Sequence, residues 1–299
     1  MSINELYEKF KQYKIIVEGR GEKTLDDYKG RFDEFCQYKN ISTEEELLKC
    51  TAQDIKDWLV SLSEKGNTEG TRNTKLSSIK EIFRYLDEEE EKEVDRKIFR
   101  IKTAKVPYKE SQYLEWQTFE SFVSYIKNIK IRLAVMIMGY EGLRYCELAQ
   151  IKCEDIIRGY AVVVGKGKKQ RTIYFSPRVM ELGMLWINNG RKKIVEKLGE
   201  DNGYLLIGEN GKVLTRRYLE WDIKRLAKQY NEKTLTKNGI DWYEHLSPHK
   251  FRHTCATHLV EQGASETEVR DILGHNDLKT TSRYTHSSKD RIRQILKEV

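Results

Sequence analysis

The segment SPHKFRHTCATHLV, residues 247–260, carries the most informative pattern in the chain. Ser247 and Pro248 predict the start of a helix, because serine is a good N-cap and proline is favoured at the first helical position. His249 and Arg252 follow three residues apart in the first turn and therefore share one face of that helix. A helix N-terminus attracts anions, so an imidazole and a guanidinium beside it indicate a phosphate-binding site.

Two other interpretations of this helix compete with that one. His253 follows His249 by four residues, as in some zinc-binding helices, but the glutamate of an HExxH motif is absent and Arg252 would repel a cation. This disfavours zinc. Taken alone, the helix is also compatible with histidines that only satisfy ordinary helix ends.

The next helix supports the functional interpretation. Ser265 and Glu268 predict a capping box, and Gly274 predicts the end of the helix. His275 follows at once, and Tyr284 comes nine residues later within KTTSRYTH. All six histidines lie between residues 245 and 286, which concentrates candidate chemistry in this part of the chain.

Two motifs precede this region. GLRYCEL, residues 142–148, places Arg144 after a glycine break and Glu147 three residues later. Residues 160–175 predict a β-hairpin, with AVVV and TIYF as strands and GKGKKQ as the turn. Lys166 lies in that turn, where two strands would aim it, and Lys168 and Lys169 add positive charge for binding DNA.

The first hundred residues predict four or five helices. Thr24 and Asp27 indicate a capping box at the start of one of them. A later helix, residues 68–86, has a buried apolar stripe and a polar side that would either face solvent or grip a DNA backbone. The residues on that polar side are Arg72, Asn73, Lys75 and Lys80.

Composition restricts the class of protein. The chain has a formal net charge of +7, with 38% hydrophobic residues and 3 prolines, which favours a folded and mainly helical protein. The longest apolar run is too short to span a bilayer. Five cysteines without a CxxC pair are typical of reduced thiols, and we expect a cytoplasmic protein without a membrane partner. Basic residues are concentrated after residue 100, which makes a phosphate-rich partner plausible.

Taken together, GLRYCEL, GKGKKQR, HKFRH and LGHNDLKTTSRYTH resemble the ordered motifs of the tyrosine recombinase (phage integrase) family. The resemblance spans residues 113–286, and residues 1–100 resemble the helical core-binding domain of the same family more weakly. It implies a mainly α fold with a small antiparallel β-sheet, arranged as a two-lobed DNA clamp. The implied domains are residues 1–100, a SAM-like DNA-binding domain, and residues 113–299, a catalytic domain, joined by the linker 101–112.

The resemblance also implies a role for each motif residue. Arg144 and Arg252 would clamp the scissile phosphate, and Glu147 would orient the first of these arginines. Tyr284 would be the nucleophile that links the protein to DNA. The remaining catalytic positions are Lys166, His249 and His275.

The family implies transesterification without metal, ATP or any other cofactor. Its partners would be double-stranded DNA and three further copies of the chain, in a tetramer on paired sites that is a dimer or a monomer free in solution. A second recombinase or an accessory protein is an additional candidate. The short two-domain layout most resembles Xer-type recombinases, which resolve chromosome dimers. An integrase of a mobile element, a type IB topoisomerase, a non-catalytic DNA-binding regulator and a purely structural helical protein remain as alternatives.

Overall fold

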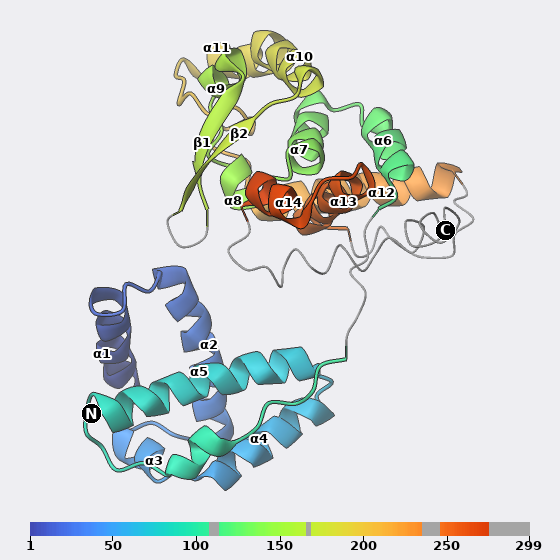
Figure 1. Ribbon diagram of the computed structural model, residues 1–299. Helices are drawn as coiled ribbons and strands as arrows, with labels where there is room; N and C mark the ends of the chain where they lie inside the picture. Colours follow the sequence, from blue (N-terminus) through green and yellow to red (C-terminus); the bar gives the residue numbers. More distant parts are fainter. Residues whose placement is uncertain (108–113, 166–168, 235–245, 275–299) are drawn as a thin grey trace, which may run out of the picture. The chain divides into compact units, whose positions relative to one another are not determined.

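The structure is a computed structural model, and it describes residues 1–107, 114–165, 169–234 and 246–274. The chain divides into two units, Met1–Tyr108 and Lys109–Val299 (Figure 1). Helices dominate both units, and the described strands form one two-stranded antiparallel sheet in the second unit. The predicted fold class, mainly α with a small antiparallel sheet, is confirmed. None of the described helices has the length and apolar composition needed to cross a bilayer.

The first unit packs five α-helices and a 3-10 helix around one core. They are α1 (Ile3–Ile16), α2 (Glu22–Lys39), α3 (Glu44–Leu48), α4 (Ala52–Glu64), α5 (Glu69–Glu88) and η1 (Arg96–Arg100). Ser2, Thr43 and Thr51 each form a capping box, which satisfies amide groups that a helix start leaves unpaired. Aromatic side chains fill much of the core, and those fully buried include Phe10, Phe32, Phe35, Trp58 and Phe83.

The start of α2 differs from the prediction. Thr24 and Asp27 indicated a capping box, but α2 begins at Glu22, with Gly21 as its N-cap and no side-chain cap. The backbone N–H of Thr24 donates to the carbonyl oxygen of Gly21 at 3.0 Å, so Thr24 already lies within the first turn. Asp27 lies in the second turn of α2, and its spacing from Thr24 occurs inside a helix as well as in a capping box. This pair alone therefore does not fix where the helix begins.

The second unit is assembled around α7, which is buried along nearly its whole length. Its elements are α6 (Trp116–Tyr125), α7 (Ile129–Tyr140), α8 (Tyr145–Leu148), α9 (Cys153–Arg158), β1 (Tyr160–Val164), β2 (Gln170–Tyr174), α10 (Pro177–Trp186), the π-helix η3 (Ile187–Arg191), α11 (Lys192–Leu198), α12 (Arg216–Thr234), α13 (Pro248–Glu261) and α14 (Glu266–Leu273). Helices α6, α10, α12 and α13 contact α7 (Figure 1). An apolar helix surrounded on several sides is a stable core element.

The hairpin β1–β2 pairs Tyr160 with Tyr174 at its base and Val164 with Gln170 beside its turn. Because side chains alternate between the two faces of a strand, Val163 and Ile173 are buried while Tyr160 and Tyr174 are exposed. The alternation places residue 171 on the buried side. From this side of the strand, the Arg171 side chain reaches Glu147 of α8.

Helix α14 lies against α13 through a small apolar cluster of its own. The cluster includes Cys255 and Val260 from α13 and Val269 and Leu273 from α14. The predicted start and end of α14 are confirmed: Ser265 forms the capping box, and Gly274 ends the helix in the left-handed conformation. The end of α14 is therefore packed against the middle of α13.

Candidate active site

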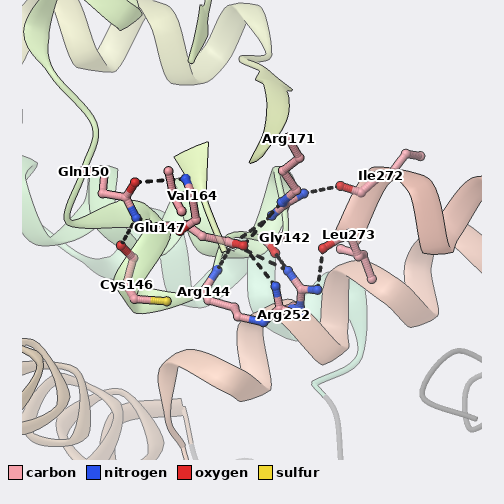
Figure 2. A network of polar contacts seen from close by, with 10 residues as sticks. All are labelled: Gly142, Arg144, Cys146, Glu147, Gln150, Val164, Arg171, Arg252, Ile272 and Leu273. Carbon is pink, nitrogen blue, oxygen red and sulfur yellow. Dashed lines mark hydrogen bonds and ion pairs between the residues drawn. The ribbon is translucent and has the colours of Figure 1, made fainter. Parts of the chain in front are cut away.

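The Glu147 carboxylate of α8, 0% exposed, lies at the centre of a cluster of arginines (Figure 2). Arg144 donates to it from its backbone N–H at 2.8 Å and from Nη1 at 3.0 Å. Arg171 of β2 donates from Nη2 at 2.8 Å. Arg252 of α13 forms an ion pair with it, with 3.8 Å between Nη1 and Oε2. Three guanidinium groups from separate parts of the second unit thus converge on one carboxylate.

The surroundings of Glu147 keep it ionised. Burial on its own would raise the pKa of this carboxyl group. The hydrogen bonds from Arg171 and from the Arg144 amide, together with the charges of Arg171 and Arg252, outweigh burial and lower the pKa below its ordinary value. The carboxylate therefore stays negative at neutral pH, and the three arginines leave the cluster with an excess of positive charge.

Arg144 reaches the cluster through the turn between α7 and α8. Gly142 in this turn has a φ of +63°, and a Cβ atom there would lie 2.2 Å from Cδ2 of Leu273, so the position requires glycine. Arg144 is the N-cap residue of α8, and its side chain is 24% exposed. The guanidinium is therefore anchored on Glu147 while part of it can contact a ligand from solvent.

Arg252 is the fifth residue of α13, and its side chain is only 4% exposed. Nη1 donates to the carbonyl oxygen of Gly142 at 2.6 Å, and Nη2 donates to that of Leu273 at 2.5 Å. A buried guanidinium needs such partners, because an unpaired buried charge is costly. These bonds fix the plane of Arg252 and join α13 to the turn after α7 and to the end of α14.

His249 lies three residues before Arg252 on α13, and it is exposed. Protein atoms around the ring still exclude part of its water, and this desolvation lowers the pKa of the imidazole. The positive charges of Arg216, Arg252 and Arg144 lower the pKa further. The ring is therefore mainly neutral at pH 7, and it can accept a proton from a group bound beside the arginines.

Four predicted site residues lie outside the described part of the chain: Lys166, Lys168, His275 and Tyr284. Gly165 and Gly274, which directly precede Lys166 and His275, border the arginine cluster. A Cβ atom on Gly165 would lie 3.2 Å from Oε1 of Glu147. A Cβ atom on Gly274 would lie 2.6 Å from Cδ of Arg171. The chain therefore approaches the cluster at the residues before 166 and 275, and the roles of the four residues stay predictions.

Two family models match the chain and together cover most of it. The model of the phage integrase family matches residues 112–291. The chain belongs to the phage integrase family. The model of the phage integrase N-terminal SAM-like domain matches residues 7–90. The predicted resemblance is confirmed.

Relatives of this phage integrase family member include the tyrosine recombinase XerC of Bacillus subtilis (strain 168). It is 27% identical over 294 residues, which cover 95% of this chain and 92% of that protein. The tyrosine recombinase XerD of Staphylococcus haemolyticus (strain JCSC1435) is 30% identical, over 98% of this chain and 97% of that protein. The family and these relatives identify the chain as a site-specific recombinase of the tyrosine type.

A solved structure of the family has the same fold. The integrase of the transposon Tn1549, in complex with a circular intermediate DNA, aligns with a TM-score of 0.75 at 20% identity. The alignment covers 100% of this chain and 99% of that one.

The basic residues predicted to contact DNA differ in their surroundings. In the first unit, Lys75 pairs with Glu34 at 2.6 Å and Arg72 pairs with Glu69 at 3.3 Å. Lys169, beside the hairpin turn of the second unit, is exposed. The side chains of Lys75 and Arg72 are only 13% and 17% exposed, so these two pairs are less accessible to a phosphate than Lys169. A DNA-binding role of these residues stays a prediction.

Asn73 and Lys80 hold the end of η1 and the segment that follows it against α5. The Asn73 amide exchanges two hydrogen bonds with the backbone of Ala104, from Nδ2 to the carbonyl oxygen and from the Ala104 N–H to Oδ1, both at 2.8 Å. Lys80 donates to the carbonyl oxygens of Phe99 at 3.1 Å and Ile101 at 2.6 Å. These contacts have a structural purpose that the sequence pattern did not indicate, and a DNA-binding role for the two residues stays a prediction.

The family motifs do not include a basic and aromatic face on α12. Trp221 on this face is 61% exposed, and the guanidinium of Arg225 lies 5.5 Å from the centre of its ring. The charge of Arg216 at the start of α12 acts on His249, so the face begins beside the site. The signal in the sequence was RRYLEWDIKRLAK, residues 216–228, whose exposed members are Arg216, Arg217, Tyr218, Trp221, Lys224, Arg225 and Lys228.

Proposed function

We propose that this recombinase cuts and rejoins double-stranded DNA through a 3′-phosphotyrosine intermediate, with Tyr284 as the nucleophile. The observation that carries the proposal is the pair of arginines, Arg144 and Arg252, held on the buried Glu147 carboxylate beside a neutral imidazole. Guanidinium groups keep their charge at any working pH and offer paired donors to the nonbridging oxygens of a phosphate. Such preorganised charge stabilises the negative charge that develops when a phosphodiester is attacked.

In the proposed reaction the phenol oxygen of Tyr284 forms a bond to the scissile phosphorus, and the bond between phosphorus and the 5′ oxygen of the next nucleotide breaks. Because the ordinary pKa of a phenol is about 10, its proton needs an acceptor, and His249 is the candidate. Lys166 would donate a proton to the leaving 5′ oxygen, and His275 would hold a nonbridging oxygen. Rejoining is the reverse reaction with another 5′ hydroxyl, so the phosphotyrosine bond conserves the energy and ATP is not required.

The DNA-binding surface that we propose includes the exposed face of α12, because this face combines positive charge with aromatic rings next to the arginine cluster. The polar side of α5, with Lys168 and Lys169 at the hairpin, would complete it. We expect the two units to close around a duplex as a clamp and four copies to assemble on two DNA sites. The DNA would be chromosomal, and the enzyme would act in the cytoplasm.

The biological role that we propose is Xer-like resolution of chromosome dimers. It is supported by the likeness to XerC and XerD over nearly the full chain, at 27% and 30% identity. The second candidate is the integrase of a mobile element, which the fold of the Tn1549 integrase favours. The two roles predict different target DNA: a single chromosomal site in the first case, and the ends of an element in the second.

A non-catalytic DNA-binding regulator is the alternative from another functional class. It would keep the arginines and the basic face of α12 for binding, without the covalent step. The two classes differ in one observable, the covalent protein–DNA complex.

The experiment mixes the full chain with labelled duplexes from its own genomic neighbourhood and with candidate recombination sites, and separates the products on a denaturing gel. We expect a slow, protease-sensitive DNA band with the native chain. The band should be absent with Tyr284→Phe, although this variant should still bind the DNA. The matched control is Tyr174→Phe, which removes the hydroxyl of an exposed tyrosine on β2 and should leave the band unchanged.

A covalent band with Tyr284→Phe would show that another residue is the nucleophile. Salt-sensitive binding by the native chain to a duplex that carries its recombination site, without any covalent band, would leave two interpretations: the non-catalytic regulator, or a recombinase that cleaves only with a second recombinase or an accessory protein. Relaxation of supercoiled DNA of any sequence would instead favour a topoisomerase with the same chemistry.

A further inference from the structure

Arg171 of β2 belongs to the arginine cluster but takes no part in the proposed reaction, and all three of its guanidinium nitrogens have partners. Nη2 donates to Oε2 of Glu147 at 2.8 Å, and Nε lies 3.4 Å from Oε1 of the same carboxylate. Nη1 donates to the backbone carbonyl oxygen of Ile272. One side chain therefore joins the carboxylate of α8 to the last turn of α14.

The α8 end of this connection holds the proposed phosphate-binding arginines. Helix α8 has only four residues, Tyr145–Leu148, too few to be a stable helix on its own. Glu147 in this helix contacts both Arg144 and Arg252. Arg171 approaches the carboxylate from the sheet, so the orientation of Glu147 depends on a residue outside its own helix.

The α14 end of the connection leads to the segment that contains His275 and Tyr284. The last carbonyl groups of a helix lack partners within the helix, and a cation there also interacts favourably with the helix dipole. The side chains of Arg171 and Arg252 donate to the adjacent carbonyl oxygens of Ile272 and Leu273. Figure 2 shows both arginines directed at this end of α14.

A direct contact between Arg171 and DNA fits the structure less well. Its side chain is 12% exposed, half the exposed fraction of Arg144, at 24%. Three of its five N–H groups are already directed at the Glu147 carboxylate and the carbonyl oxygen of Ile272, which leaves fewer donors for a phosphate. Arg171 therefore acts on other residues.

We propose that Arg171 is a positioning residue, which sets the Glu147-bound arginines and the end of α14 in register and so fixes the point from which the chain continues to His275 and Tyr284. The effect of Arg171 on catalysis rests on the proposed function. The link between β2, α8 and α14 is a structural claim, and it can be tested without any reaction.

The first test measures amide hydrogen exchange of the full chain without DNA, because exchange reports local opening of a helix. Arg171→Met keeps most of the apolar stem and removes the three donors. We expect faster exchange in α14 by roughly tenfold or more, with little change in the first unit. The control is Arg158→Met, which removes an arginine that pairs with Asp155 elsewhere in the second unit and should not affect α14.

The second test measures DNA affinity separately from the maximal rate of covalent complex formation at saturating DNA. Arg171→Met should lower the rate by roughly 10- to 100-fold, as for outer partners that orient metal ligands, and should leave Kd nearly unchanged. Arg171→Lys should recover part of the rate, because a lysine can still pair with Glu147 but cannot also reach Ile272. Melting temperatures of all variants would show that the fold is retained.

Unchanged exchange in α14 with Arg171→Met would overturn the proposed link. A loss of DNA affinity as large as the loss of rate would overturn the positioning role, because Arg171 would then bind DNA itself. If the native chain forms no covalent complex on its own recombination site, the proposed function fails, and hydrogen exchange still decides whether Arg171 holds α14.

Discussion

Glu147 is fully buried and touches the guanidinium groups of Arg144, Arg171 and Arg252. Taking a charge out of water is costly, and removing one partner of a buried ion pair leaves the others without compensation. Arg252, itself 4% exposed, would lose the nearest negative charge among the described residues. At the scale of single residues, the electrostatic balance of the site therefore depends on Glu147.

Glu147→Gln should reduce the free energy of unfolding by about 3 kcal/mol or more, because the buried arginines lose their counter-charge. Urea denaturation of the full chain measures this change. Glu154→Gln is the matched control: its carboxylate lies on the neighbouring helix α9, is 66% exposed and pairs with Lys152 at 3.8 Å. The control should change the free energy by less than about 0.5 kcal/mol. Equal effects of the two substitutions would contradict the account.

His249 gives the cleavage reaction a pH dependence. The neutral ring is the proposed acceptor, and its pKa is lowered by desolvation and by neighbouring arginines, so it protonates only below its ordinary pKa of about 6.5. The maximal rate of covalent complex formation should therefore fall on the acid side with a midpoint below about pH 6.5. Arg216→Gln removes a positive neighbour, so the pKa of His249 should rise and the midpoint should move up.

The matched control for this shift is Arg217→Gln, since Arg217 is also exposed on α12 but is not among the charges with the largest effect on His249. A midpoint that stays in place with Arg216→Gln, or that lies above pH 7 in the native chain, would argue against His249 as the acceptor.

Single residues of the site were predictable only where the motifs include them. Arg144, Glu147 and Arg252 meet in the structure, as their predicted shared role requires. Arg171 belongs to GKGKKQR, but its partners Glu147 and Ile272 are 24 and 101 residues away in the chain, and spacing along the sequence does not reveal such contacts. The available signal was its position two residues before the buried Ile173, which places Arg171 on the buried face of the strand.

At the scale of elements, capping residues made several helices predictable. Ser265 is the N-cap that the sequence indicated, and the helix predicted from residue 68 has Thr68 as its N-cap. These signals are local, since a cap bonds to an amide within three residues. The role of Asn73 as a partner of Ala104 was not predictable, because it joins a helix to a segment 31 residues later.

The turn between α7 and α8 yields a prediction at this scale. Gly142→Ala would force a residue with a side chain into a φ of +63° and bring its Cβ atom to 2.2 Å from Cδ2 of Leu273. We expect a loss of roughly 2–4 kcal/mol of stability from backbone strain and overpacking together. Chemical denaturation measures this loss.

Gly203→Ala separates the two contributions, because Gly203 has a similar φ of +76° but no atom within 4 Å of its hypothetical Cβ. This control should show the backbone strain alone, about 1 kcal/mol. If both substitutions reduce the stability by the same amount, the close packing of Gly142 against α14 does not contribute to stability.

For the whole molecule, the uneven distribution of charge is informative. The net charge of +7 arises after residue 100, in the unit that contains the arginine cluster and the basic face of α12. The sequence predicted a phosphate-rich partner for this part of the chain, and family membership agrees with it. The sequence did not indicate that α12 carries much of the exposed charge, because the periodicity of a basic helix is also that of any solvated helix.

Salt dependence tests the role of α12. DNA binding that neutralises phosphates weakens with salt by about 0.9 logarithmic units per neutralised phosphate. Replacing Arg217, Lys224 and Lys228 by glutamine should therefore reduce the slope of log K against log salt by roughly 1 for each phosphate that the variant no longer neutralises. Binding titrations at several salt concentrations measure the slope.

The matched control replaces the exposed lysines 192, 193 and 197 of α11 by glutamine, and so removes the same charge from another helix of the same unit. Its slope should stay close to that of the native chain. An equal decrease of the slope in both variants would mean that overall charge, and not the face of α12, determines binding.

The central claim is a covalent bond between Tyr284 and the 3′ phosphate of cleaved DNA. Its most direct test is mass spectrometry of the trapped complex after digestion of the DNA with nuclease and of the protein with protease. We predict a nucleotide remnant on the peptide that contains Tyr284, attached through the tyrosine oxygen. A remnant on any other residue, or a cleaved 3′ end that carries no protein, would contradict the claim.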